Sequence, residues 1–316
     1  MKRRTFLTRS ASAAAGFVLT LPGLSRVRAG ETTKRFSLGF APHPDMFKNL
    51  AGPNVIDQIK FAADQGFTAW EDNGMPGRPA AEQEKIGQTL ANLRMQMGLF
   101  VAYASFDEPT FAVPNPAKQE EILGRIREAV VIAKRCGAKC CTVVPGSVDQ
   151  QSNKVKDWNM YGGPRLSEGY QTANVIELLR RCAAILEPHG LAMVLEPLNW
   201  HRDHGGVFLQ QSDQAYAVCR AVKSPACKIL FDVYHQQITE GNLIPNIDRC
   251  WDEIGYFQCG DNPGRKEPGT GELNYRNIFK AISETGYKDF VALECGHSTK
   301  NYEDTLKATL ECLNWT

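Results

Sequence analysis

The feature that most constrains the fold is a repeated alternation of short apolar segments with longer amphipathic ones. Eight apolar segments predict strands, over residues 36–41, 68–71, 99–105, 139–144, 192–198, 228–234, 256–259 and 290–294. Between them, apolar residues recur with the helical period, and several such segments end at a glycine, the residue favoured just after a helix (Gly66, Gly137, Gly190 and Gly286). Strands that alternate with helices predict a parallel sheet, and eight such units in this length predict one α/β domain, a (β/α)8 TIM barrel.

A doubly wound open sheet is the alternative architecture. No G-x-G-x-x-G follows the first predicted strand, and no G-x-x-x-x-G-K-[ST] occurs in the sequence, so the nucleotide-binding motifs of that architecture are absent. No low-complexity linker marks a second domain. We expect residues 148–165, after the fourth predicted strand, to form a long loop that is part of a lid.

Residues 1–29 have the pattern of an export signal. Arg3-Arg4 followed by Thr5-Phe6-Leu7 matches the twin-arginine pattern, and Val27-Arg28-Ala29 resembles a cleavage site. The apolar run over residues 11–22 is too short to span a bilayer, so we expect no stable membrane anchor. Residues 30–316 would then form the barrel, in the periplasm. A disordered basic tail and an uncleaved lipid-facing anchor are the alternatives.

The charge balance bears on the class of partner. The chain has a formal net charge of +1, and residues 1–29 contribute six basic and no acidic residues, which leaves −5 for the remaining 287. A mildly acidic chain is poorly suited to a phosphate backbone, so we expect a small-molecule substrate and no nucleic-acid partner. The oligomeric state stays open, a homo-oligomer included.

The ten cysteines would suggest disulfides in an exported protein. However, there is no C-x-x-C, and most of the cysteines lie in apolar runs, where free cysteine packs as a small hydrophobic residue. The twin-arginine route also carries proteins that fold in the reducing cytoplasm. We therefore expect most of these cysteines to be buried thiols.

Polar side chains stand at the ends of the last four predicted strands. Glu196, Asp232, Gln258 and Glu294 each follow or end a mostly apolar run, and His235 comes three residues after Asp232. In a barrel these ends meet at one mouth, where the chemistry of such enzymes lies. Clustered carboxylates cannot all stay ionised there without a cation, and an all-oxygen set suits Mg²⁺ or Mn²⁺.

Four segments carry a resemblance to a known family: "LEPLN", "FDVYHQQITEGNLI", "IGYFQCGDNPGRKEPGTGELNY" and "GYKDFVALE". Together they resemble the hydroxypyruvate isomerase family, within the xylose isomerase-like TIM barrels. The likeness is close over residues 194–294, and the earlier part shares only the strand and helix rhythm. The resemblance implies that Glu196, Asp232, Gln258 and Glu294 bind the metal. It also implies that Glu196 and Glu294 exchange protons with the substrate.

The resemblance implies a metal-dependent isomerase of a small hydroxy-carbonyl compound, most simply one that converts hydroxypyruvate to tartronate semialdehyde through a cis-enediolate. It places His235 against the substrate oxygen that becomes the enediolate, and Glu71, which ends the second predicted strand, could bind a substrate hydroxyl. A sugar or keto-glycoside epimerase with the same glutamate pair, and a non-catalytic sugar-binding barrel, are the alternatives. Ketose 3-epimerases resemble the chain less, because they carry His where Gln258 stands.

Two segments depart from the family pattern: "APHPDMF" after the first predicted strand and "NWHRDHGGVF" after the fifth. Both would touch the substrate. His201, Asp203 and His204 in the second segment suggest zinc, but this H-x-x-H lacks a third placed ligand. A nuclease of the endonuclease IV type needs many more His and Asp ligands than a chain with six His offers.

The charged segment "GDNPGRKEPGTGELNY", residues 260–275, follows Gln258 directly. Its prolines and glycines predict a rigid loop that forms one wall of the site. Arg265 can offer its planar fork to a substrate carboxylate or to a neighbouring acid. We expect Glu267 and Glu272 to hold the loop by capping or ion pairing, and Asn274-Tyr275 to begin the next helix.

Overall fold

The computed structural model describes residues 36–148 and 166–315. The predicted export signal over residues 1–29 lies outside the described residues, as does nearly all of the predicted lid loop over 148–165.

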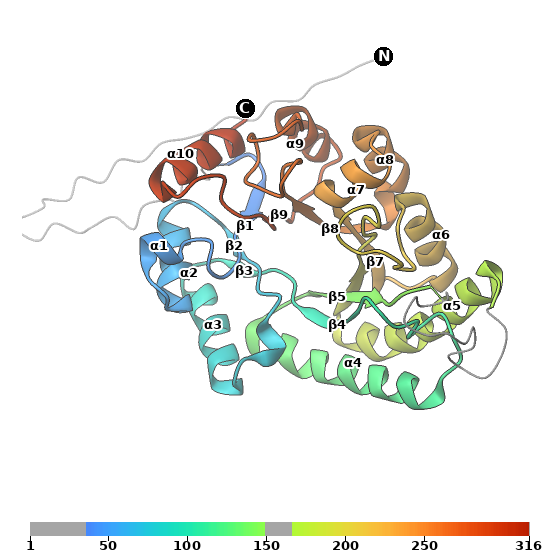
Figure 1. The fold of residues 1–316 in the computed structure, drawn as a ribbon. Helices are drawn as coiled ribbons and strands as arrows, with labels where there is room; N and C mark the ends of the chain where they lie inside the picture. The colour runs from blue at the N-terminus through green and yellow to red at the C-terminus, as the bar shows by residue number, and fades with distance from the viewer. Residues whose placement is uncertain (1–35, 149–165, 316) are drawn as a thin grey trace, which may run out of the picture. The chain divides into compact units, whose positions relative to one another are not determined.

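Seven parallel strands form the main sheet, in the order β1-β9-β8-β7-β6-β5-β4. Their bounds are β1 Gly39–Ala41, β4 Val101–Ser105, β5 Cys140–Pro145, β6 Ala192–Leu195, β7 Cys227–Asp232, β8 Ile254–Cys259 and β9 Phe290–Leu293. Neighbours in chain order pair in parallel from β4 to β9, and β9 returns to pair with β1. The sheet therefore curls round with its first and last strands adjacent, and in Figure 1 it lies inside a ring of helices.

Two short strands, β2 Ala69–Trp70 and β3 Gln96–Met97, complete the barrel as a separate parallel pair. Backbone hydrogen bonds join this pair to the sheet: the Glu71 N–H donates to Pro42 (2.9 Å), and the Thr142 N–H donates to Phe100 (2.8 Å). The predicted α/β barrel is confirmed.

The third predicted strand, over residues 99–105, is β4, which begins at Val101, and the short strand β3 lies before the predicted range. Gly98 stands between them at a close approach. A Cβ at Gly98 would lie 2.6 Å from the hydroxyl of Tyr256, so the chain can pass that hydroxyl only without a side chain. The strand period alone does not reveal this contact.

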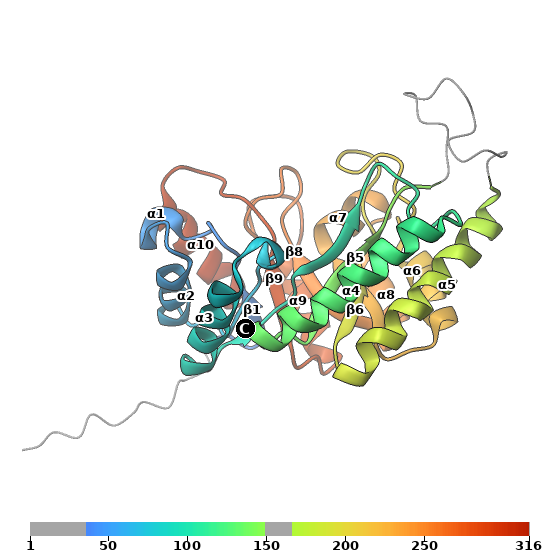
Figure 2. The same ribbon diagram turned by 90° about the horizontal axis from the view of Figure 1, so that it is seen from below.

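The helices follow the strands along the chain and lie outside the sheet in both views (Figures 1 and 2). Their bounds are α1 Lys48–Ala51, α2 Val55–Asp64, α3 Ala80–Asn92, α4 Pro116–Cys136, α5 Glu168–Leu186, α6 Ser212–Val222, α7 Val233–Thr239, α8 Leu243–Cys250, α9 Tyr275–Glu284 and α10 Tyr302–Leu313. Short 3₁₀ turns occur at Met75–Gly77, Glu187–His189 and Trp251–Glu253.

Local sequence explains several helix ends. The Asn115 side chain caps α4 by accepting from the Lys118 N–H, with Pro116 at the first position, and Gly137 ends the helix in a left-handed conformation. Asn274 caps α9, which begins at Tyr275 as predicted.

Two predicted strands end earlier than expected. β6 stops at Leu195 because Pro197, two residues on, has no N–H for the ladder. β7 stops at Asp232, because the Asp232 side chain accepts from the Tyr234 N–H (2.9 Å) and caps α7. Both early stops place an acidic residue at the strand end.

Apolar packing fills both sides of the sheet. Inside the barrel, Ala41, Val194, Leu230, Tyr256 and Ala292 form a buried cluster. A larger cluster lies between the sheet and the helices.

The ten cysteines are free thiols, eight of them buried, as predicted. Across residues 36–148 and 166–315, no helix is both long and apolar enough to cross a membrane.

Candidate active site at the carboxyl ends of the strands

The four predicted metal ligands stand at or just after the ends of four adjacent strands, β6 to β9. Asp232 ends β7 and pairs in register with Gln258 of β8, which in turn pairs with Ala292 of β9. Glu294 follows β9 directly, and Glu196 follows β6. Asp232 and Gln258 are buried, and 27% of the Glu294 side chain is exposed.

Arg265 links two of these acids. One guanidinium nitrogen, Nη2, donates to Asp232 Oδ2 (3.1 Å) and to Glu294 Oε2 (2.9 Å). Its guanidinium also lies 4.9 Å from the centre of the Tyr234 ring, a cation–π contact. The sequence left two partners open for Arg265, a substrate carboxylate or a neighbouring acid. In the structure Arg265 contacts the neighbouring acids.

Burial dominates the electrostatics of the cluster. Burial raises the pKa of Asp232 to about 7, although the nearby Arg265 opposes this shift. Burial also raises the pKa of Glu196 well above its usual range, and the charges of Glu294 and Asp232 raise it further. The acids therefore compete with one another for ionisation, as expected for a cluster that lacks enough positive charge.

The side-chain amide of Gln258 is oriented by Glu71. Its Nε2 donates to Glu71 Oε1 (2.9 Å), while the Tyr256 hydroxyl donates to Glu71 Oε2 (2.9 Å). Glu71 is fully buried, and each of its two carboxylate oxygens accepts one of these hydrogen bonds. This contact leaves Gln258 Oε1 buried without a hydrogen-bond partner.

That orphaned oxygen is the strongest sign that the residues fit a metal ion. A buried polar atom without a partner lowers the stability of the fold, because it has lost its hydrogen bonds to water. Coordination of a metal ion would replace those lost interactions. Glu196, Asp232 and Glu294 add carboxylate oxygens at the same strand ends. The donor set is all oxygen, with three carboxyl groups among its members, which suits a hard divalent cation.

His235 is oriented by a residue whose role the sequence did not reveal, Asn199. The backbone N–H groups of Arg202 and Asp203 donate to Asn199 Oδ1, which turns the Asn199 Nδ2 group toward His235 Nδ1 (2.7 Å). The Asn199 backbone N–H also donates to His235 Nδ1 (3.2 Å). Asn199 stands in the quoted "LEPLN" segment, and its position after Glu196 was the available signal.

This arrangement fixes the tautomer of His235. Since Nδ1 accepts hydrogen bonds, the proton of the neutral ring lies on Nε2. Nε2 is buried without a partner, 3.6 Å from Glu196 Oε1 and 3.6 Å from Asp232 Oδ2. Burial lowers the pKa of His235 well below its usual value, and Arg265 and His204 lower it further.

Within the described residues, the His, Cys, Asp and Glu side chains near enough to share a metal are Glu196, Asp232 and His235. Because His235 Nε2 carries a proton, this ring is a hydrogen-bond donor. The predicted ligand Glu294 is outside this group, and its carboxylate accepts from Asn73 and Arg265. His201 and His204 are outside that group. The His201 ring stacks on Trp200, and the His204 ring stacks on Phe106. The zinc alternative therefore gains no support from the described residues.

The loop over residues 260–275 is held by buried acids. Asp261 is fully buried and accepts backbone hydrogen bonds from Gly269 (2.8 Å) and Leu273 (3.2 Å). Glu267 accepts from the backbone and the hydroxyl of Ser298, and Glu272 accepts from Asn262 Nδ2 (2.8 Å). Buried Glu267 and exposed Glu272 thus hold the loop by hydrogen bonds, and neither forms an ion pair among the described residues; Asp261 was missed.

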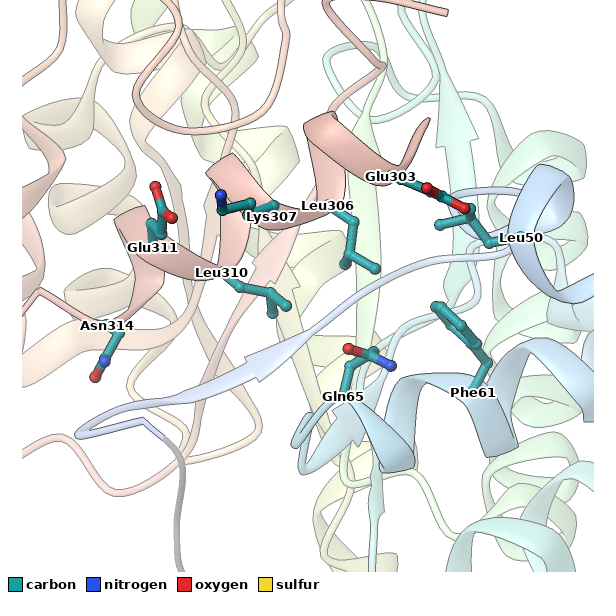
Figure 3. Close-up of a pocket in the computed structure, with 9 residues that line it drawn as sticks. All are labelled: Leu50, Phe61, Gln65, Glu303, Leu306, Lys307, Leu310, Glu311 and Asn314. Carbon is teal, nitrogen blue, oxygen red and sulfur yellow. The ribbon is translucent and has the colours of Figure 1, made fainter. Parts of the chain in front are cut away.

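A separate cavity of about 520 Å³ lies in the helical layer, between α10 and the α1–α2 region (Figure 3). Leu50, Phe61, Leu306 and Leu310 supply its apolar lining. None of the strand-end acids lines it, so it is distinct from the candidate site.

Residues 59–314 match the family described as Xylose isomerase-like TIM barrel. A putative hydroxypyruvate isomerase of Homo sapiens is 31% identical over 57% of this chain and 61% of its own length. The hydroxypyruvate isomerase of Escherichia coli (strain K12) is 38% identical over 39% of this chain and 47% of its own length. The chain thus aligns with less than two thirds of either relative.

A third relative aligns over more of its length. The 2-oxo-tetronate isomerase of Pectobacterium atrosepticum is 32% identical over 76% of this chain and 85% of its own length.

Solved structures agree with the fold. A family 2 AP endonuclease of Brucella melitensis superposes with a TM-score of 0.69 at 22% identity, over 88% of this chain and 97% of that one. A 3-keto-D-glucoside 4-epimerase of E. coli superposes with a TM-score of 0.69 at 18% identity, over 88% of this chain and 98% of that one. At these identities the likeness is one of fold alone. Together with the sequence matches it confirms the resemblance to the hydroxypyruvate isomerases: the chain belongs to the family of xylose isomerase-like TIM barrels.

Proposed function

We propose that the protein is a metal-dependent isomerase that moves a proton between two adjacent carbons of a hydroxy-carbonyl compound. The observation that carries this proposal is the buried, unpartnered Oε1 of Gln258 beside three strand-end carboxylates. Hydroxypyruvate, with tartronate semialdehyde as product, is the smallest compound pair that fits. The relatives named hydroxypyruvate isomerase and 2-oxo-tetronate isomerase support the same reaction type.

Glu196, Asp232, Gln258 Oε1 and Glu294 would hold the metal, Mg²⁺ or Mn²⁺. When bound, such an ion polarises the carbonyl and hydroxyl oxygens and so lowers the pKa of the C–H bond between them.

The proton transfer falls to Glu196 and Glu294, which approach from β6 and β9. One carboxylate takes the proton from the carbon that bears the hydroxyl, and the other delivers a proton to the neighbouring carbon. The hydroxyl proton passes to the former carbonyl oxygen, so the old hydroxyl becomes the new carbonyl and the product is an isomer of the substrate. A glutamate with a raised pKa is the stronger base, which suits Glu196 to this task.

His235 would stabilise the oxygen on which negative charge develops. Its Nε2–H is unpartnered, and Asn199 fixes the direction of the ring. A donor held in place before reaction costs no reorganisation when the charge appears. Arg265, which forms ion pairs with Asp232 and Glu294, has a buried Nε–H donor without a partner.

The basic, acid-free segment at residues 1–29 leads us to propose that the protein works in the periplasm after twin-arginine export.

The experiment that tests the function is NMR in D₂O with hydroxypyruvate and a panel of small keto acids and ketoses, with Mg²⁺ or Mn²⁺ added. We expect metal-dependent incorporation of solvent deuterium at the carbon next to the carbonyl. Absence of exchange and of product across the panel, with either metal, would contradict the proposal.

A further inference from the structure

The loop after β6 contains a turn that Asn199 and Asp203 close from both ends. The Asp203 N–H donates to Asn199 Oδ1 (3.2 Å), and Asn199 Nδ2 donates to Asp203 Oδ2 (2.8 Å). The His204 N–H also donates to the Asn199 carbonyl (3.1 Å). Because backbone and side-chain bonds run in both directions, the turn fixes the place of the Asp203 carboxylate.

Asp203 Oδ2 accepts a second hydrogen bond, from outside this loop. Tyr234, in the first turn of α7, donates its hydroxyl to this oxygen (2.9 Å). A carboxylate oxygen has two lone pairs, so it can accept from Asn199 and Tyr234 at once. One oxygen atom therefore joins the loop after β6 to the residue that precedes His235 in the chain.

The two donors to Asp203 each support a side chain that keeps a buried N–H without a partner, His235 at Nε2 and Arg265 at Nε. Asn199 Nδ2 lies 2.7 Å from His235 Nδ1, so this amide group has one hydrogen for Asp203 and one for His235. The Tyr234 ring faces the Arg265 guanidinium, whose central carbon lies 4.9 Å from the ring centre. We call these contacts the His235 arm and the Arg265 arm.

We propose that Asp203 is a positioning residue of the candidate active site, which orients His235 through Asn199 and Arg265 through Tyr234. This inference rests on the proposed function, because that reaction needs both donors to have fixed directions. A donor that is held in place before the reaction stabilises developing charge without reorganisation. A misplacement of about 1 Å in such a site can lower the rate about 100-fold.

The charge of Asp203 suits this role. Burial raises its pKa, but the hydrogen bonds from Asn199 and Tyr234 lower it, and the result lies below the usual value. Asp203 is therefore ionised at neutral pH, and hydrogen bonds to an ionised acceptor are stronger than bonds to a neutral one. The exposed Arg202 lies 3.9 Å from the other oxygen, Oδ1, so it does not compete with the two donors at Oδ2.

The test compares variants of the full-length protein that remove one arm or both. Asp203→Ala removes the shared acceptor of both arms, and Asp203→Asn keeps an acceptor oxygen. Tyr234→Phe keeps the ring but removes the hydroxyl, so it loosens only the Arg265 arm. Asp64→Ala, at an exposed acid on α2, is the matched control. Circular dichroism verifies that each variant folds.

Nitrogen-15 NMR reads the two arms without relying on turnover, in protein with Mg²⁺ and without it. The signals of His235 and Arg265 are assigned from the spectra of His235→Asn and Arg265→Lys. In the wild type, His235 should show one tautomer, with the proton on Nε2, and Arg265 should show one sharp Nε–H signal. Asp203→Ala should shift or broaden both signals, and Asp203→Asn should disturb them less. Tyr234→Phe should disturb only the Arg265 signal.

Turnover of hydroxypyruvate supplies a second readout. Asp203→Ala should lower kcat about 10- to 100-fold. Its affinity for Mg²⁺ should change far less, because within the described chain the hydrogen bonds of Asp203 involve Asn199 and Tyr234 and none of the proposed ligands. The double variant Asp203→Ala/Tyr234→Phe should lose little more than Asp203→Ala alone, since both changes remove the same hydrogen bond.

The positioning role is overturned if folded Asp203→Ala keeps the wild-type signals of both His235 and Arg265. It is also overturned if Asp64→Ala disturbs these signals as much. If Asp203→Ala does not fold, Tyr234→Phe decides, and an Arg265 signal identical to that of the wild type overturns the proposal.

Failure of the proposed function would look different. In that case both signals would respond to Asp203→Ala as expected, but no compound would take up deuterium from D₂O. Conversely, deuterium uptake together with unchanged His235 and Arg265 signals in Asp203→Ala would keep the isomerase and discard the positioning role.

Discussion

Gln258 donates from its side-chain Nε2 to Glu71 at 2.9 Å, and this contact leaves Oε1 as the amide atom without a partner. Oε1 is buried, and Gln258 pairs in register with Asp232, one of the strand-end acids. From its place in the sequence Glu71 could bind a substrate hydroxyl or have a structural role; in the structure its two oxygens accept from Tyr256 and Gln258.

The first prediction concerns this contact. Glu71→Ala should weaken Mn²⁺ binding about 10- to 100-fold, the usual effect of losing a residue that orients a ligand. Glu71→Gln keeps an acceptor oxygen for Gln258 and should weaken it much less. Titration calorimetry measures both affinities. Unaltered Mn²⁺ binding in Glu71→Ala would show that Gln258 is not oriented by this contact, or is not a ligand.

The second prediction separates metal binding from stability at Asp232. Asp232 both faces the site and caps α7 through the Tyr234 N–H. Asp232→Ala should lose the metal and also lower the unfolding free energy by about 1 kcal/mol, the value of a helix cap. Asp232→Asn keeps a capping oxygen, so it should lose the metal at nearly native stability. Elemental analysis measures the bound metal, and thermal melts measure the stability. Full metal occupancy in Asp232→Ala would contradict the proposal that Asp232 is a ligand.

The third prediction concerns the proton-transfer pair. Glu196→Gln and Glu294→Gln keep the side-chain shape and an oxygen but remove the base. Each should lower kcat by about 10²–10⁴-fold with a far smaller loss of metal affinity. The two losses should not add in the double variant, because the groups act as a unit. Near-normal turnover in Glu294→Gln would exclude it as a base and favour a hydride shift or a non-catalytic role.

The fourth prediction is a pH dependence of metal affinity. Burial raises the pKa of Asp232 to about 7, so below that pH the metal-free protein holds a proton on this carboxyl group. The metal must displace that proton, so its affinity should fall as pH falls from about 8 to about 6, with proton release on binding. Calorimetry in buffers of different ionisation enthalpy measures the released protons. An affinity that is flat across this range would count against Asp232 as a ligand.

The fifth prediction concerns export. Replacing both Arg3 and Arg4 with Lys should leave the protein in the cytoplasm, because the twin-arginine pair is read by a receptor and the charge alone does not substitute for it. Cell fractionation with immunoblotting tests this. Unchanged export would point to another route.

The periodicity of the chain was sufficient to predict the barrel and the rim at which its strand-end polar residues meet. Parallel strands alternate with helices in a fixed sense, so polar residues that end apolar runs at Glu196, Asp232, Gln258 and Glu294 had to reach one rim. The loop after β8 was predictable as rigid from its prolines and glycines. These features depend on local pattern and on topology, which the order of residues encodes directly.

Contacts between residues far apart in the chain were decided only by the tertiary structure. Glu71 and Gln258 are separated by 187 positions, and nothing in either local segment reveals their hydrogen bond. The same holds for the stack of Phe106 on His204 and for the close approach of Gly98 to the Tyr256 hydroxyl. Their physical cause is close packing between strands and loops, where distance depends on the whole barrel. The alternation of strands and helices in the sequence therefore determined which residues stand at the strand ends. Packing between distant segments determined their side-chain partners, such as Glu71 for Gln258.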